Sequence, residues 1–170
     1  MNMKKLALSV GLSGIVLAAG ATTLAIQANE SSQPATAQTS NSSAGTAITV
    51  YKSPNCGCCQ SWAEHLEANG FETTIVETDD LNAIKQQHDV PRDMASCHTA
   101  LVDDLVIEGH VPANDILAYL EDPQFNTAGL SVPGMPHGTP GMETGRKDDY
   151  QVIAFNANGQ QQVFREHKDY

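Results

Sequence analysis

Basic residues are few in this chain of 170 residues, with 9 lysines and arginines against 20 aspartates and glutamates. The formal net charge is therefore −11, and it becomes −13 if Lys4 and Lys5 are removed with a leader. A surface of this sign repels nucleic acid and anionic lipid and concentrates cations. We expect no nucleic-acid partner. The same negative charge is also explained by solubility alone.

The chain has a single long hydrophobic run, and it lies at the N-terminus. Lys4 and Lys5 precede the apolar segment "LALSVGLSGIVLAAGATTLAI", and small residues follow at Ala19, Ala21 and Ala28. This pattern predicts a cleavable signal peptide over residues 1–28 and export to the periplasm. An uncleaved membrane anchor is the alternative, since roughly 20 apolar residues span a bilayer. No cysteine follows the run, so a lipoprotein anchor is excluded.

Residues 29–46 lack the apolar side chains that folding requires, because they consist almost entirely of Ser, Thr, Ala, Gln and Asn. We expect them to form a disordered linker. The folded domain is predicted over 47–170, and a domain of roughly 120 residues buries a core without needing disulfides. A purely structural role as disulfide bridges is therefore a weak account of its cysteines.

The hydrophobic pattern after the linker alternates strands with helices. Gly70 is a helix stop, Pro91 and Pro112 mark a helix end and a helix start, and Asn158-Gly159 marks a hairpin turn. The predicted order is strand 47–53, helix 55–69, strand 71–78, helix 79–90, hairpin 99–110, helix 112–122 and, after a Gly/Pro-rich loop, hairpin 150–166. This order predicts a thioredoxin-like α/β fold, with a small mixed sheet flanked by helices and a C-terminal β-hairpin.

Cysteine is absent outside two short segments. Cys56, Cys58 and Cys59 lie in "SPNCGCCQSW", and Cys97 lies in "MASCHTA". Cys56 and Cys59 form a C-x-x-C pair at a predicted helix start, where the helix dipole favours thiolate over thiol. The spacing suits a reversible disulfide or two ligands on one soft metal ion, and it favours a Cys56–Cys59 bridge over a strained vicinal one.

Further residues favour a metal site over a disulfide catalyst. Cys58 would scramble a catalytic bridge, whereas a polynuclear site uses every sulfur. Cys97 lies just before the predicted third strand. In the thioredoxin layout, the loop before this strand faces the N-terminus of the first helix. Thiolate, thioether and imidazole suit Cu(I). The candidate metal ligands are Cys56, Cys58, Cys59 and Cys97, followed by Met135, Met142, His98 and His110.

Simpler structural roles are also compatible with these residues. Cys97 is consistent with a buried apolar cysteine, Met135 and Met142 with cover for a hydrophobic edge, and the two histidines with structural hydrogen bonding. Trp62 is expected in the core. Structural zinc is disfavoured, because such sites usually take two separated ligand pairs.

With these residues in view, the sequence resembles the CopG-type family of exported copper-resistance proteins, a domain long catalogued as of unknown function. The resemblance covers about residues 48–165. It is carried by "YKSPNCGCCQSW", "GFETTIVETDDL", "VPRDMASCHTALVDDLVIEGHVPANDI" and "GLSVPGMPHGTPGME". It implies a periplasmic thioredoxin-like domain with copper bound at the cysteine cluster, and it allows conversion between Cu(I) and Cu(II) there.

The family motifs fall on Cys56, Cys58 and Cys59, on Ser96–Thr99, on Gly134–Pro136 and on Gly141–Glu143, while Asp103-Asp104-Leu105 departs from the usual turn. We therefore expect a periplasmic protein that captures Cu(I), including in a polynuclear cluster. Its partners would be copper ions and other periplasmic copper-handling proteins, with membrane contact only through an uncleaved N-terminal segment. The alternatives are a thiol–disulfide oxidoreductase, with Cys56 and Cys59 as its catalytic residues, and an interaction module with two inert disulfides.

Overall fold

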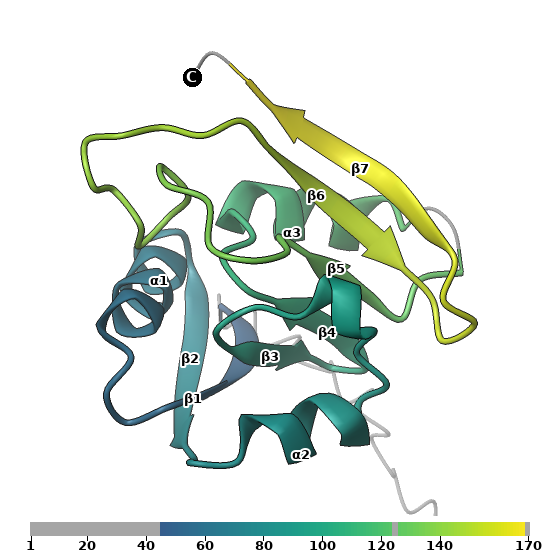
Figure 1. Cartoon of the computed structure of the whole chain (residues 1–170), viewed down its shortest axis with the longest axis horizontal. Helices are drawn as coiled ribbons and strands as arrows, with labels where there is room; N and C mark the ends of the chain where they lie inside the picture. The colour runs from purple at the N-terminus through teal and green to yellow at the C-terminus, as the bar shows by residue number, and fades with distance from the viewer. Residues whose placement is uncertain (1–44, 124–125, 169–170) are drawn as a thin grey trace, which may run out of the picture. The chain divides into compact units, whose positions relative to one another are not determined.

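The computed structural model describes residues 45–123 and 126–168; the predicted signal peptide and nearly all of the predicted linker lie outside them. Figure 1 shows one mixed sheet flanked by helices. The seven strands follow the spatial order β2-β1-β3-β4-β5-β6-β7. The elements are β1 (Thr46–Lys52), α1 (Gly57–Ala68), β2 (Phe71–Glu77), α2 (Leu81–Gln87), the 3-10 helix η1 (Arg92–Met94), β3 (Thr99–Val102), β4 (Leu105–Glu108), α3 (Ala113–Glu121), β5 (Gly129–Ser131), β6 (Tyr150–Phe155) and β7 (Gln161–His167).

The predicted fold class is confirmed, including the flanking helices and the C-terminal hairpin of β6 and β7. Strands β1 and β2 are parallel around α1, and β3 and β4 form the expected hairpin through Asp103-Asp104. The first helix begins at Gly57, not at the predicted Asn55, because Cys56 keeps an extended conformation as its N-cap.

Strand β5 was missed, since the prediction assigned the whole segment to a Gly/Pro-rich loop. It contains only three residues, too few to show a strand periodicity. It forms because β4 pairs with it on one side and β6 on the other. A side chain at Gly129 would collide with the Val106 carbonyl and the Phe155 ring, so glycine permits this close approach. The predicted small sheet is therefore larger than expected.

Helices α1 and α3 cover one face of the sheet. Trp62 and Leu66 of α1 and Ile116 of α3 are fully buried in one cluster with the inward residues of β1, β3 and β4. The predicted buried stripe of α1 is confirmed, since Cys59, Trp62, Ala63 and Leu66 are its buried residues. The opposite face carries α2 and η1 above a smaller cluster of Met94, Val106 and Phe155.

Strand β7 contacts α3 through ionic interactions. The Asp115 carboxylate in the first turn of α3 accepts from Arg165 Nε at 2.6 Å and lies 2.6 Å from His167 Nε2. An acidic group at this position also faces the positive end of the helix dipole. Within residues 45–123 and 126–168, no helix has the length and hydrophobicity needed to cross a membrane.

We predict that Trp62→Phe lowers the free energy of unfolding by about 2–4 kcal/mol. Trp62 is fully buried, and its indole Nε1–H donates to the Val111 carbonyl at 2.9 Å. Phenylalanine would leave that carbonyl unpaired and a void beside it. Urea unfolding measures the change, with the half-exposed Val163→Ala as the control, expected within about 0.5 kcal/mol of wild type. Equal effects of the two substitutions would contradict the assigned role of Trp62.

Candidate metal centre

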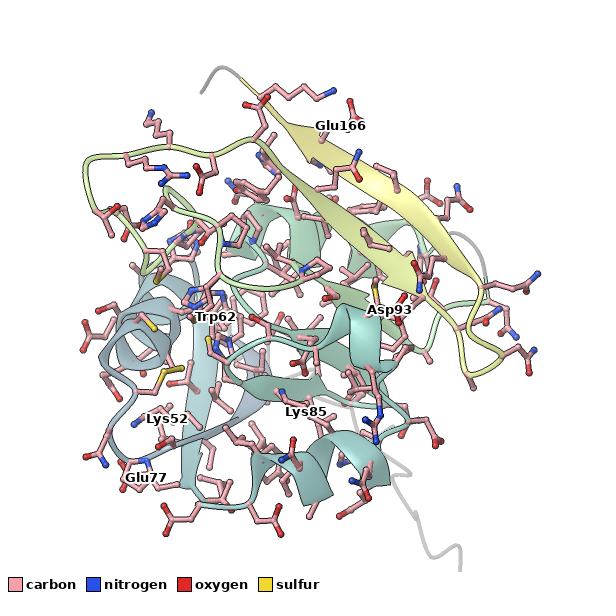
Figure 2. All side chains as sticks on the ribbon, viewed as in Figure 1. Lys52, Trp62, Glu77, Lys85, Asp93 and Glu166 are labelled. Carbon is pink, nitrogen blue, oxygen red and sulfur yellow. A yellow bond between two sulfur atoms is a disulfide. The ribbon has the colours of Figure 1, made fainter. Side chains whose placement is uncertain are left out.

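Three cysteine sulfurs lie at the start of α1. Cys56 is the N-cap, and Cys58 and Cys59 belong to the first turn. Cys56 and Cys59 form a disulfide with their Cα atoms 5.3 Å apart, as the spacing predicts, and Cys58 and Cys97 are free thiols. Figure 2 draws the disulfide as a yellow bond beside α1. The Cys58 Sγ lies 3.5 Å from the Cys56 Sγ, so the three sulfurs are already one group.

Cys97 joins this group from a distant part of the sequence. Its Sγ lies 3.6 Å from the Cys59 Sγ, and all four cysteine sulfurs lie within 4.8 Å of one another. The predicted convergence of four sulfurs is confirmed as geometry. Cys97 is half-buried, and its sulfur contacts that of Cys59.

The sheet accounts for how Cys97 reaches the helix. Strand β3 runs antiparallel to β1, with Tyr51 opposite Thr99. The residues just before β3 therefore lie beside those just after β1, which lead into α1. The short segment Ser96–His98 is thus placed against the first turn of the helix.

His98 and His110 form a second group with Cys97. The Cys97 Sγ lies 3.4 Å from His98 Nδ1 and 3.1 Å from His110 Nε2, and both rings are fully buried. His110 Nδ1 lies 2.7 Å from the Pro140 carbonyl, which only accepts hydrogen bonds. Nδ1 therefore carries the proton in the neutral ring, and the Nε2 lone pair faces Cys97. A buried imidazole held in this way is ready to act as a ligand.

Burial sets the protonation of this group. It raises the pKa of the Cys97 thiol to about 12, with the neighbouring Cys58 adding to the rise. Burial lowers the pKa of His110 and lowers that of His98 well below its ordinary value. Without a metal, Cys97 is therefore a neutral thiol beside two neutral imidazoles. A cation that replaces the thiol proton would find one anionic and two neutral donors.

The Gly/Pro-rich loop between β5 and β6 covers the start of α1 (Figure 1). Gly141 has a φ of +82°, and a side chain there would meet the Cys58 carbonyl. Met135 is exposed and lines a surface depression together with Cys97. Met142 is half-buried, and its backbone bonds Gly138 and Thr139 within the loop. Met135 thus shares a depression with Cys97, and the backbone contacts of Met142 close the loop.

Sequence reasoning missed a buried carboxylate that supports the site. Glu108 of β4 is fully buried and forms an ion pair with Lys85 of α2. Its carboxylate also accepts the Ser96 N–H at 2.6 Å and the Thr99 hydroxyl at 2.7 Å. These bonds hold the backbone on both sides of the Cys97–His98 pair. A glutamate at the end of the apolar strand "LVIE" was the available signal, because an unpaired buried carboxylate is costly.

The fold and the site define a class: an α/β protein with a sulfur-rich centre at the N-terminal end of its first helix. The family described as "Protein of unknown function, DUF411" matches residues 94–142. A solved structure of copper resistance protein CopG, form 1, is 48% identical with a TM-score of 0.68, and the match covers 72% of this chain and 98% of that one. Form 2 of the same protein is 47% identical with the same TM-score and coverage. No curated protein sequence gave a match.

The chain therefore belongs to the CopG family of copper-resistance proteins. The resemblance inferred from the motifs is confirmed by an identity of 48% over nearly the whole length of the solved structure.

We predict that His98 makes stability fall as the pH drops below its ordinary pKa of 6.5. The unfolded chain binds a proton there that the folded state excludes, so the stabilisation is present above that pH and lost below it. For one fully buried histidine the loss is about 1.4 kcal/mol per pH unit. Urea unfolding of wild type and His98→Leu at about pH 7.5 and about pH 5.5 measures it.

The wild type should lose more stability between the two pH values than His98→Leu. Burial raises the pKa of Glu108, which has the opposite effect on the pH dependence, but both proteins carry Glu108 and its effect cancels. Equal losses in the two proteins would show that His98 is not held neutral.

Proposed function

We propose that this protein captures Cu(I) on the sulfurs of Cys56, Cys58, Cys59 and Cys97 as an exported protein of copper resistance. The observation that carries the proposal is the approach of all four sulfurs to within 4.8 Å of one another. Soft thiolates are ligands that favour Cu(I). Membership of a copper-resistance family and the acidic surface both favour a copper cargo.

The number of donors supports more than one copper ion per chain. Cu(I) is satisfied by two or three sulfurs, so four sulfurs exceed the need of one ion. His98 and His110 add two imidazoles around Cys97, and Met135 adds a thioether in the depression that it lines with Cys97. Met142, next to the Gly141 that packs against the Cys58 carbonyl, is a further candidate ligand. The set is that of a polynuclear Cu(I) cluster sharing bridging thiolates.

The disulfide gives the same site a redox activity. Two thiolates, on Cys56 and Cys59, release two electrons as their S–S bond forms, and these electrons reduce two Cu(II) ions to two Cu(I) ions. The bridge removes two of the four cysteine ligands. Cys58 and Cys97 remain as thiols, and Cys97 keeps His98 and His110 beside it. Imidazole together with one thiolate also suits Cu(II).

Thiol–disulfide exchange with other proteins is the second candidate function. It is favoured by the Cys56–Cys59 disulfide at a helix N-terminus, where Cys56 is partly exposed and Cys59 is buried. Cys56 would be the attacking or attacked sulfur and Cys59 the resolving one. The two additional thiols in contact with the bridge favour the copper function over this one.

We further propose the organisation that the sequence predicts: a signal peptide over 1–28, a linker over 29–46 and the copper-binding domain over 47–170. The periplasm is the proposed location, where other copper-handling proteins would deliver or receive the ion. Strand β1 begins at Thr46, one residue before the proposed domain start.

Anaerobic titration of the fully reduced protein with Cu(I), with metal analysis and thiol counting on the same sample, tests the function. We expect more than one copper per chain in the wild type and fewer in Cys58→Ser, because Cys58 is a bridging donor. A plateau at one copper that Cys58→Ser leaves unchanged would refute the cluster.

Substitution of Cys97 tests the convergence itself. We expect Cys97→Ser to lower the Cu(I) affinity by more than about tenfold, the loss that follows removal of even an outer partner of a metal ligand. Its free energy of unfolding should change by about 1 kcal/mol or less, since the site is a partly exposed loop. Competitive Cu(I) titration and thermal melting measure the two effects. A lower melting temperature with unchanged affinity would make Cys97 a structural residue.

A further inference from the structure

Two free thiols contact the disulfide, one at each of its sulfurs. The Cys97 Sγ lies 3.6 Å from the Cys59 Sγ, and the Cys58 Sγ lies 3.5 Å from the Cys56 Sγ. A thiolate in contact with a disulfide sulfur is the starting arrangement of thiol–disulfide exchange. The bridge therefore has two internal exchange partners.

The two partners are not equivalent. Attack by Cys58 on Cys56 would join residues two apart within the first turn of α1, in a small ring that the helix backbone opposes. Attack by Cys97 on Cys59 joins residues 38 apart, in elements that the sheet already holds in contact. The second bridge closes no small ring within the helix, so Cys97 is the favoured partner.

We propose that Cys97 exchanges with the Cys56–Cys59 disulfide, so that the oxidised protein also exists in a form bridged between Cys59 and Cys97. The Cys97 thiolate attacks the Cys59 sulfur, the Cys59–Cys97 bond forms, and the Cys56–Cys59 bond breaks. The bonding electron pair leaves with the Cys56 sulfur. The proton lost by Cys97 passes to solvent, and the number of disulfides is unchanged, so no oxidant or reductant is needed.

The position of Cys56 favours its departure. It is the N-cap of α1, where the unpaired N–H groups and the positive end of the helix dipole stabilise a thiolate. A stabilised thiolate is the better leaving group in exchange. Because partial burial disfavours the Cys97 thiolate, the exchange should be slow, within the range of seconds to hours typical of disulfide reshuffling.

The exchanged form leaves Cys56 and Cys58 as two free, partly exposed thiols at the helix start. Their sulfurs are of the chemical class that binds Cu(I), so the oxidised protein would keep a two-sulfur site for the ion. This consequence rests on the proposed copper function, whereas the exchange itself rests only on the arrangement of the sulfurs.

The test follows the bridge in copper-free, full-length Cys58→Ser, which is oxidised at Cys56–Cys59 and has Cys97 as its one free thiol. The folded protein is incubated with iodoacetamide for increasing times, denatured, digested with trypsin and mapped by mass spectrometry. Trypsin separates the helix cysteines, in peptide 53–85, from Cys97, in peptide 93–146. A bridge to Cys97 is therefore seen as a cross-link between the two peptides.

We expect the cross-linked species to accumulate with Cys56 alkylated, at a rate independent of protein concentration. The matched control Cys58→Ser/Cys97→Ser has no free thiol, and it should give neither label nor cross-link. Wild type run in parallel guards against a folding defect of the variant, since the cross-link must form there as well. The proposal would be wrong if iodoacetamide alkylates Cys97 while the Cys56–Cys59 disulfide remains intact. It would also be wrong if the cross-linking rate increases with protein concentration.

The absence of copper from this experiment separates the two hypotheses. If no cross-link forms, the exchange proposal is wrong, and the result of the Cu(I) titration does not change. If the reduced protein does not bind Cu(I), the copper proposal is wrong, and an observed cross-link still supports the exchange.

Discussion

The antiparallel pairing of β1 with β3 is the constraint on which the site depends. It places Thr99 opposite Tyr51, and with it the Cys97–His98 segment against the first turn of α1. The backbone of this segment is then fixed from the opposite face of the sheet by Glu108, which accepts the Ser96 N–H. The buried Lys85–Glu108 pair is not a simple source of stability, because desolvation offsets much of its attraction. Its structural effect is to hold the cysteine that completes the sulfur group.

Burial is the reason why this arrangement favours a metal ion or a disulfide over free thiolates. The same desolvation raises the pKa of Cys97 and lowers the pKa values of His98 and His110, so each group is neutral on its own. Cys97 loses its proton favourably when a cation balances the charge of the thiolate or when a disulfide bond replaces the S–H bond. The proposed copper binding and the disulfide chemistry would thus depend on one local environment. The loop that places the Pro140 carbonyl on His110 sets which ring nitrogen is free to take part.

Much of the fold follows from local patterns. The buried stripe of α1, the turn at Asp103-Asp104 and the turn at Asn158-Gly159 come from side-chain spacing and turn chemistry, which act over a few residues. The three-residue strand β5 does not, because a neighbour on each side is needed to form it. The glutamate in "LVIE" is a visible signal, but its partners could not be named from the sequence, since they come from α2 and from the segment before β3.

The sequence by itself determined the cysteine spacing, the helix that carries it and the family to which the chain belongs, because each of these depends on short segments of the sequence. Only the tertiary structure decided that Cys97, His98 and His110 meet the helix cysteines, and that Cys97 contacts the buried sulfur of the disulfide. Residues 38 positions apart are brought together by strand pairing and core packing, whose register is a property of the whole sheet. The chemistry of each sulfur therefore depends on neighbours that its own segment of sequence does not contain.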